Sequence, residues 1–415
     1  MRHTRPARLL LAVLASVLVL PVLPSSAASA APSTAERRKV ETFPTPGSVG
    51  ITITGHGYGH GKGLSQYGAL GAAKQGLTWQ QIDEFYYPGT TWGRIGGKIR
   101  VLITADTGRD VQVAAQRGLE VTSLSKRRTW RIPPIAARKW RLVGAGSGTA
   151  VQYTKGGGWR TWKKVPGEAE FGSTTGVLTL VTPAGRRDYR GTLQSVAPRQ
   201  STKRETVNRL SMEAYLRGVV PREVPASWEP DAVSAQSVAA RTYAAFERSH
   251  PSAAHYDLCD TSNCQVYGGV DDEHPDATAA IQATAKQGLF YDGRPAFTQF
   301  SASNGGYSAV GSMPYLVAQA DPYDSLANPA YSTWTKAIDD TQIEAKWPTI
   351  GDLTSIEVTT RNGYGEWGGR VVDIAFTGTT GTFRTDGDTV RDAFALNSDW
   401  FTFTVTPRQK GQLRE

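Results

Sequence analysis

The sequence predicts an α+β fold, with strand-rich and helical segments in separate parts of the chain. The composition, with 44 Gly and 11 Trp in 415 residues and only 20% charged residues, favours turns and strands over a helical bundle. Apolar and polar residues alternate in several runs between 98 and 202 and again beyond 351, while helical patterns lie between 203 and 300. The composition excludes collagen, coiled coils and low-complexity disorder, and the length allows at most two or three domains.

The N-terminus has the pattern of a secretory signal peptide. Three arginines precede an apolar run over 9–23, and Ala28-Ser29-Ala30 supplies a small-x-small cleavage site. A retained membrane anchor is the alternative, but Pro21 and Pro24 end a run that is short for a membrane span. We therefore expect residues 1–30 to be removed and the mature protein to be secreted or associated with the cell wall.

The charge of the chain changes with this processing. The whole chain has 46 Lys and Arg against 37 Asp and Glu, a formal charge of +9. Loss of the three leader arginines leaves 43 basic residues against 37 acidic ones, a charge of +6. Such an exported protein is drawn to polyanions, which outside the cell are wall polymers and anionic headgroups. The chain has no nucleic-acid-binding motif, so nucleic acid is not an expected partner.

The segment after the leader, 31–48, is rich in Ala, Ser, Thr and Pro and is expected to be a disordered linker. Residues 49–92 are expected to pack on the main domain. Ile51–Thr54 alternates like a short strand and leads into Gly55–Gly63, where a glycine at every second position lets the backbone reach positive φ. Helices are predicted over 64–75, with Gly76 as the stop, and over 79–85.

Residues 98–202 are predicted to form a β-rich subdomain. Strand patterns occur at 98–103, 111–113, 119–121 and 176–181. Four tryptophans of this subdomain stand beside Arg or Lys: Trp130, Trp140, Trp159 and Trp162. They indicate either a sugar-stacking or wall-binding face, or strands with Trp inward and Arg outward, and we favour the second interpretation.

Residues 203–320 have the strongest organisation and are expected to form the core of the domain, which strands in 321–410 complete. Helices are predicted over 210–218, 230–250 and 275–287, and Pro230 fits the first turn of the second helix. Later strands are predicted at 356–358, 371–376 and 401–405.

Glu223 is the candidate for chemistry. It lies in Val220-Pro221-Arg222-Glu223-Val224-Pro225, with Trp228 nearby, so its carboxyl has mostly apolar neighbours. Desolvation disfavours the charged form and raises the pKa of such a carboxyl, as a general acid near neutral pH requires. The structural alternative is a surface glutamate paired with Arg222 or Arg217.

Four further patterns occur at Val219–Pro225, Ala235–Ala244, Cys264–Gly269 and Ser301–Gly306. They resemble the stage II sporulation protein D (SpoIID) and LytB amidase-enhancer family. The resemblance implies a peptidoglycan-active protein: a lytic transglycosylase in sporulating bacteria, with relatives described as amidase enhancers. The family's catalytic acid falls on Glu223, although Val224 stands where Met is common.

The resemblance implies a glycan-cleaving site around Glu223. One carboxyl would protonate the oxygen between MurNAc and GlcNAc and then accept the proton of the MurNAc 6-hydroxyl, where ordinary glycosidases need two carboxylates. Candidates for orienting sugar hydroxyls are His60, Gln66, Gln236, Arg241, Ser301, Ser303 and Asn304. For Gln236 and Arg241, buried hydrogen bonds that hold the helix are an equal alternative.

Two main classes of function remain open at this point, beside a third, weaker interpretation as a purely structural cell-surface protein. The first is a lytic transglycosylase that leaves 1,6-anhydro-MurNAc ends on peptidoglycan glycan strands and needs no cofactor. The second is a non-catalytic wall-binding protein that stimulates a separate cell-wall amidase. The intact Glu223 favours the first, and the Trp/Arg segment from Trp130 to Trp162 favours the second.

The order of motifs along the chain suggests a circular permutation. In the family, a Gly-x-Gly-His-Gly-x-Gly-x-Ser-Gln-x-Gly-Ala segment usually lies at the C-terminal end of the domain, whereas the matching Gly57–Ala69 lies near the N-terminus here. We hypothesise that Ile51–Thr54 packs beside Trp400–Val405 and brings His60 towards Glu223, because permutation requires only that the old termini lie close.

Cys259 and Cys264 are the two cysteines of the chain. An even cysteine count in an exported protein favours a disulfide. The alternative is a zinc site with His255 or His250, because some family members carry Cys and His ligands here. This stretch offers no obvious fourth ligand for a closed zinc site, so we favour the disulfide.

Overall fold

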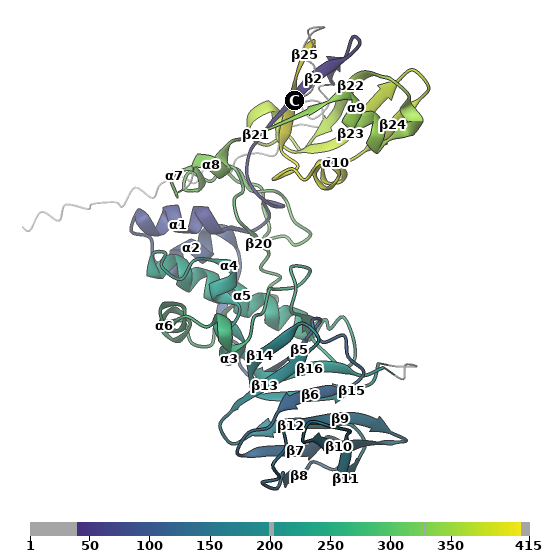
Figure 1. Ribbon diagram of the computed structural model, residues 1–415. Coiled ribbons are helices and arrows are strands. Elements are labelled where there is room, and N and C mark those ends of the chain that lie inside the picture. The colour runs from purple at the N-terminus through teal and green to yellow at the C-terminus, as the bar shows by residue number, and fades with distance from the viewer. Residues whose placement is uncertain (1–39, 199–202, 328, 408–415) are drawn as a thin grey trace, which may run out of the picture. The chain divides into compact units, whose positions relative to one another are not determined.

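The computed structural model describes residues 40–198, 203–327 and 329–407, and its mixture of strands and helices confirms the α+β class (Figure 1). The predicted signal peptide over 1–30 lies outside the described residues. Within them, no helix is both long and apolar enough to cross a membrane.

Two sheets make up the β-rich part of the chain. A seven-stranded sheet contains, in spatial order, β17 (Leu258–Cys259), β5 (Lys98–Leu102), β16 (Glu205–Ser211), β15 (Thr192–Val196), β12 (Ala169–Ser173), β7 (Leu119–Ser123) and β8 (Arg128–Arg131). A six-stranded sheet contains β11 (Arg160–Pro166), β10 (Gly148–Thr154), β9 (Lys139–Ala145), β6 (Val111–Ala114), β13 (Val177–Thr182) and β14 (Gly185–Arg190). Strands such as β7 alternate buried and half-buried residues, which explains why their pattern is readable in the sequence.

Four smaller sheets lie in the rest of the described chain. A four-stranded sheet contains β1 (Glu41–Pro44), β22 (Leu353–Arg361), β23 (Val371–Gly378) and β24 (Thr382–Thr385). Two three-stranded sheets contain β21 (Trp334–Asp339), β2 (Val49–Gly55) and β25 (Phe401–Pro407), and β19 (Arg294–Pro295), β18 (Gln287–Tyr291) and β4 (Thr91–Arg94). The last sheet pairs β20 (Phe300–Ser301) with β3 (Leu64–Ser65) in parallel.

The helices are grouped mainly around one central helix, α5. They are α1 (Gln66–Lys74), α2 (Trp79–Tyr86), α3 (Met212–Arg217), α4 (Val220–Glu223), α5 (Pro230–Ser249), α6 (Pro275–Ala283), α7 (Asp324–Ala327), α8 (Pro329–Ser332), α9 (Asp340–Lys346) and α10 (Gly387–Phe394), with 3₁₀ turns at Val270–Asp272, Pro348–Ile350 and Glu366–Gly368. Small buried residues along α5, among them Ala235, Ala239 and Ala244, let neighbouring elements approach it closely from more than one side.

Four predicted segments differ from the structure. The helix predicted from Leu210 begins at Met212, since Leu210 and Ser211 belong to β16. The linker prediction over 31–48 is wrong at its described end, because Glu41–Pro44 forms β1, where Glu41 pairs with Arg361 at 2.9 Å and Phe43 packs on an apolar cluster. The helix predicted from Leu64 begins at Gln66, since Leu64 and Ser65 pair with β20. The helix predicted to reach Gln287 ends at Ala283, since Gln287 begins β18.

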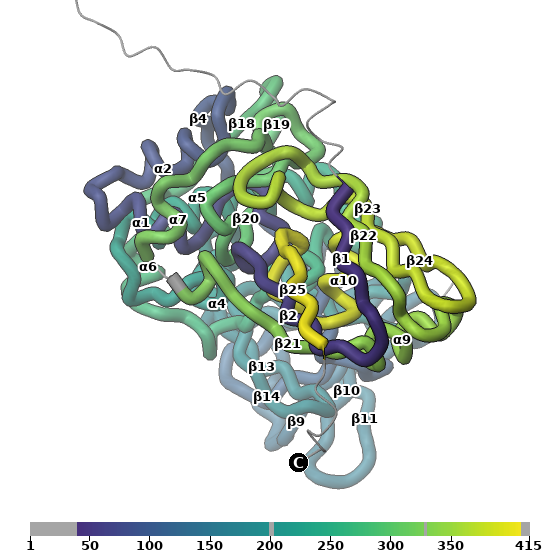
Figure 2. The backbone as a smooth tube through the Cα atoms, turned by 90° about the horizontal axis from the view of Figure 1, so that it is seen from above, coloured from purple at the N-terminus to yellow at the C-terminus, as the bar shows by residue number. Residues whose placement is uncertain are grey.

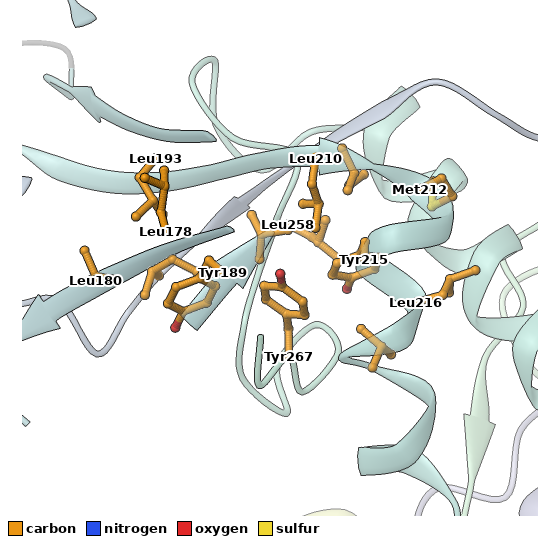
Figure 3. Packing of buried hydrophobic residues seen from close by; sticks show 14 of the residues in the cluster. Leu178, Leu180, Tyr189, Leu193, Leu210, Met212, Tyr215, Leu216, Leu258 and Tyr267 are labelled. Atoms are coloured by element: carbon orange, nitrogen blue, oxygen red, sulfur yellow. The ribbon is translucent and has the colours of Figure 1, made fainter. Parts of the chain in front are cut away.

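Buried apolar residues form three clusters. The largest joins the two big sheets to α3, α5 and α6, and Figure 3 shows Leu210, Tyr215, Leu258 and Tyr267 of this cluster converging where strands meet the helices. A second cluster lies among β2, β22, β23 and β25, and a third among α1, α2 and α5. The third cluster packs α1, whose first residue is Gln66, against α5.

The strand β2 lies in the middle of its sheet. It pairs antiparallel with β21 and with β25, with Ile51 opposite Val405, and both Figures 1 and 2 show it alongside β25. Its residues alternate between buried and half-buried, and Ile51 and Ile53 are no more than 1% exposed. The expected packing of Ile51–Thr54 beside Trp400–Val405 is therefore observed.

Candidate active site

Glu223 lies in a cavity of about 400 Å³ built from segments far apart in the sequence. Its lining comprises Tyr58, Gly59, His60, Gln66, Glu223, Tyr243, Ser262, Asn263, Cys264, Val266, Gln299, Phe300, Ser301 and Ala302. Three of the predicted sugar-orienting residues, His60, Gln66 and Ser301, belong to this lining. Among the described residues of the lining, Glu223 is the only carboxylate.

The environment of Glu223 is set by the short helix α4. Val220 and Val224, on either side of the glutamate in sequence, are buried, and the Glu223 side chain itself is partly buried. Burial raises the pKa of Glu223 from 4.5 to about 7. Hydrogen bonds from the Val266 backbone amide and the Gln66 side chain, and the charge of Arg222, act in the opposite direction on this pKa. The carboxyl is thus held in place and still divided between its protonated and charged forms near neutral pH.

Gln66 reaches Glu223 because it is the first residue of α1. Ser65 caps this helix by accepting a hydrogen bond from the Gly68 amide at 3.0 Å. The Ser65 hydroxyl also donates to Asp324. Gln66 is only 8% exposed, so its side chain is confined to the wall of the cavity.

The glycine-rich loop is shaped by its alternating glycines. Gly57, Gly59, Gly61 and Gly63 all have positive φ, between 66° and 104°. A Cβ atom on Gly59 would lie 2.7 Å from Cβ of Ser301, and one on Gly63 would lie 2.0 Å from the Gln299 carbonyl oxygen. The glycines therefore let this loop pack directly against residues 299–305, which brings two separate motifs to one cavity.

His60 lies in this loop in its neutral form. Burial, followed by the charges of Lys62 and Arg370, lowers its pKa from 6.5 to about 4. Its Nδ1 accepts a hydrogen bond from the Lys62 amide at 3.0 Å, and the ring donates to the Phe300 carbonyl. Because both ring nitrogens are engaged by the backbone, His60 forms the wall of the cavity and is poorly placed to transfer protons.

The serine and asparagine candidates divide into two groups. Ser301 lines the cavity, and its Oγ accepts from the Gly61 amide at 3.1 Å. Ser303 and Asn304 do not line it, and the prediction that they orient sugar is not supported by their positions. Ser303 instead donates to Asp324 at 2.6 Å, and Asn304 donates to Asp321 at 2.7 Å. Both aspartates are buried, and buried carboxylates need hydrogen-bond donors from the protein.

Gln236 and Arg241 also lie away from the cavity, buried in α5. Arg241 is fully buried and forms an ion pair with Glu213 at 2.9 Å, and its remaining donors reach backbone carbonyls, including that of Ile281 at 3.2 Å. Gln236 is 1% exposed. The position of Arg241 favours the alternative given above, in which buried hydrogen bonds hold the helix, whereas the buried Gln236 side-chain amide makes no hydrogen bond to the described residues.

The two cysteines form a disulfide that closes one wall of the cavity. Cys259 and Cys264 are bonded to each other, and Ser262, Asn263 and Cys264 line the cavity. His255, the alternative zinc ligand, instead contacts Glu205 at 2.6 Å. Across the described ranges, no group of three or more His, Cys, Asp and Glu side chains is arranged to hold a metal.

The Trp/Arg segment of the β-rich subdomain is mainly structural in its packing. Trp140 is 2% exposed, whereas Trp130 and Trp162 are half-buried against the largest apolar cluster. Cations cover the other rings: Lys163 lies over Trp130 and Trp162, and Arg141 lies 4.2 Å from the centroid of Trp159.

Several lining residues were not predicted. Tyr58 lies within the Gly57–Ala69 pattern and Gln299 lies two positions before Ser301, so proximity to these patterns was the available signal. Asn263 stands between the two cysteines, and Tyr243 is part of the Ala235–Ala244 pattern. None of them has a sequence context that separates a cavity residue from an ordinary surface residue.

Comparison with known proteins finds similarity to one family over part of the chain. A family model described as SpoIID, stage II sporulation protein, matches residues 200–291. The amidase enhancer of Bacillus subtilis (strain 168) is 34% identical over 137 residues, which are 32% of this chain and 18% of that protein. An uncharacterized protein of Brachyspira hyodysenteriae is 32% identical over 138 residues, 32% of this chain and 37% of the relative. Stage II sporulation protein D of B. subtilis is 26% identical over 279 residues, 60% of this chain and 78% of that protein.

The chain thus spans well under half the length of the first two of these relatives. The matched residues 200–291 include Glu223 and the disulfide but not the glycine-rich loop, which joins them through the fold. The comparisons support the resemblance that the motifs predict: residues 200–291 match the SpoIID family model, and the chain is similar to stage II sporulation protein D and to an amidase enhancer.

Proposed function

We propose that this protein is an exported, wall-associated lytic transglycosylase that cleaves MurNAc–GlcNAc bonds of peptidoglycan glycan strands. The observation that carries the proposal is a cavity whose lining offers one carboxyl, Glu223, with a pKa raised to about 7. Hydrolysis by the common two-carboxylate route requires a second carboxyl about 5–9.5 Å from the first. A reaction in which one group acts as acid and then as base needs only Glu223.

The proposed reaction consumes no water molecule, because the MurNAc 6-hydroxyl is the nucleophile. Protonated Glu223 donates its proton to the glycosidic oxygen as the bond from that oxygen to C1 of MurNAc breaks. The Glu223 carboxylate then accepts the proton of the MurNAc 6-hydroxyl while the oxygen of that hydroxyl bonds to C1. This step forms the 1,6-anhydro ring and restores protonated Glu223. The Gln66 side chain and the Val266 amide support the charged form between these two steps.

Mass spectrometry of digested peptidoglycan tests this proposal. The protein without residues 1–30 is incubated with intact and with peptide-stripped peptidoglycan, and Glu223→Gln is the matched control. New 1,6-anhydro-MurNAc ends are expected from the wild type and none above background from Glu223→Gln. Equal activity of the two proteins would remove Glu223 from the mechanism.

A second candidate function is a non-catalytic enhancer of a cell-wall amidase. The likeness to a protein named amidase enhancer, 34% identical over 137 residues, favours it. In that case neither substrate would gain anhydro ends, the protein would still bind the wall, and it would accelerate a purified N-acetylmuramoyl-L-alanine amidase. Glu223→Gln would then stimulate the amidase as well as the wild type does.

A further inference from the structure

Four aromatic side chains form a continuous strip that begins at the Glu223 cavity. Tyr58 stacks on Tyr331 with ring centroids 5.3 Å apart, Tyr331 contacts Tyr67 at 5.1 Å, and Tyr67 contacts Trp228 at 5.0 Å. The rings come from four separate places: the glycine-rich loop, α8, α1 and the turn between α4 and α5. We call these four residues the aromatic strip.

The aromatic strip is open to solvent. Tyr58 is 45% exposed, and the other three side chains are partly exposed, with Trp228 also packed against the largest apolar cluster. No cation–π contact within the described ranges involves any of the four, in contrast to Trp130, Trp159 and Trp162 of the β-rich subdomain. The strip therefore offers flat apolar surface that ionic neighbours do not cover.

The position of the aromatic strip ties it to the site. Tyr58 itself lines the Glu223 cavity. Trp228 follows Glu223 by five residues and lines a neighbouring cavity of about 480 Å³, together with Ala226, Val233 and Ala280. A chain-like ligand that leaves the Glu223 cavity past Tyr58 would meet Tyr331, Tyr67 and Trp228 in turn.

We propose that the aromatic strip is an extended subsite for β-1,4-linked N-acetylated aminosugars, which holds the glycan strand beyond the sugars that occupy the Glu223 cavity. This inference rests on the proposed function, since it assigns the occupant from continuity with the Glu223 cavity. Pyranose rings present flat C–H faces that pack on aromatic rings, and tyrosine adds a hydroxyl at the edge of its apolar face. The strip would select for strand length, because each further sugar adds one more contact.

Chito-oligosaccharides of two to six units test this subsite as neutral β-1,4-linked probes. Binding is measured by titration calorimetry in Glu223→Gln, which prevents cleavage. The hexamer is expected to bind more tightly than the dimer. Tyr331→Ala and Tyr67→Ala are expected to weaken hexamer binding about tenfold, which corresponds to about 1.4 kcal/mol, and to leave dimer binding unchanged.

Three controls separate stacking from other effects. Tyr331→Phe and Tyr67→Phe keep the ring and are expected to retain hexamer binding, so an equal loss in the Phe and Ala variants would overturn the proposal. Trp159→Ala removes a partly buried ring in the β-rich subdomain and is expected to change nothing. A loss confined to Trp159→Ala would move the binding face to that subdomain. Unchanged thermal unfolding of each variant shows that it is folded.

The outcome is independent of catalysis. Hexamer binding that depends on Tyr331 and Tyr67 would support the subsite even if the wild type released no anhydro ends from peptidoglycan. Conversely, cleavage by the wild type together with equal hexamer and dimer affinities, or with no oligosaccharide binding by Glu223→Gln, would overturn the subsite and leave the proposed function standing.

Discussion

Glu223 is subject to two opposing influences on its carboxyl. Burial favours the neutral acid, while the Val266 amide, the Gln66 side chain and the charge of Arg222 favour the carboxylate. A group that must give up a proton and then take one back benefits from this balance, because neither form is strongly preferred near neutral pH. The apolar neighbours of Glu223 in sequence predict the first influence, whereas Gln66 lies more than 150 positions away.

The pH dependence of the proposed reaction follows from the pKa of Glu223. The first step needs protonated Glu223, so kcat/KM for release of anhydro ends should fall about tenfold per pH unit above a pKa of about 7. Below that pKa, kcat/KM should level off as far as Glu223 is concerned. Initial rates between pH 5 and 9 measure the profile (about two pH units on either side of neutrality). A flat profile over this range would show that the acid is another group.

Gln66→Leu should shift this profile in a defined direction. The Gln66 hydrogen bond lowers the pKa of Glu223, so its removal raises that pKa and moves the alkaline limb to higher pH. The Leu side chain has a similar size and keeps Glu223 buried. A shift to lower pH would contradict this role of Gln66, and a fall in rate with no shift would indicate that Gln66 acts on the substrate and not on the acid.

Single residues also show where prediction from sequence ends. The polar side chains of Ser301–Gly306 were all expected to face glycan, but only Ser301 lines the Glu223 cavity. Ser303 and Asn304 are 1% and 0% exposed and turn towards Asp324 and Asp321, which lie outside every recognisable motif. The partners of a buried donor are set by tertiary packing, and local sequence does not contain them.

Among the elements, the start of α1 is fixed by a buried carboxylate in α7. Asp324 accepts hydrogen bonds from Ser65, from Ser303 at 2.6 Å and from the Asn304 amide at 3.2 Å, and thereby joins α1 to the segment that carries Ser301. Since Gln66 is the first residue of α1, the position of Asp324 determines how Gln66 meets Glu223.

Asp324→Ala should destabilise the fold and disturb the site together. It leaves several buried donors without an acceptor, at about 1–3 kcal/mol each, so the free energy of unfolding should fall by at least about 3 kcal/mol. Urea denaturation measures this change. Asp276→Ala, whose side chain is 70% exposed, is the control and should cost less than about 0.5 kcal/mol. Similar small effects for both variants would contradict this role of Asp324.

The disulfide also fixes a local element of the structure, since it closes a short loop that lines the same cavity as Glu223. The cysteines are separated by five positions, and a loop of this size is stabilised by about 2 kcal/mol when it is bridged. Cys259→Ser combined with Cys264→Ser should lower Tm and raise KM for glycan strands, and reductant should affect the wild type but not this variant. Stoichiometric zinc in the purified wild type would contradict the disulfide and favour the metal alternative.

At the scale of the whole molecule, the glycine-rich loop depends on a strand that pairs with the other end of the described chain. Val49 lies opposite Pro407 in the β2–β25 register, and Gly55 lies opposite Phe401, so the loop that follows β2 starts from a fixed point. The α+β class and most long elements could be predicted from periodicity. The aromatic strip could not, because its four rings come from separate segments with no shared pattern.

The β2–β25 pairing makes a permuted chain testable. A chain that begins at Leu77 and runs to Glu415, then continues from Ala31 to Gly76, places the glycine-rich loop and α1 at the C-terminal end. The new break lies between α1 and α2, at an exposed Gly76 where an added Cβ would contact nothing within 4 Å. Circular permutation is tolerated at such sites when the original ends are close. We therefore expect a near-UV circular dichroism spectrum like that of the native order and a comparable rate of release of anhydro ends.

A second permutant opened between Ala239 and Ala240, inside the buried helix α5, should fail to fold. If the first permutant fails in the same way, the connection from α1 to α2 is itself required to assemble the site.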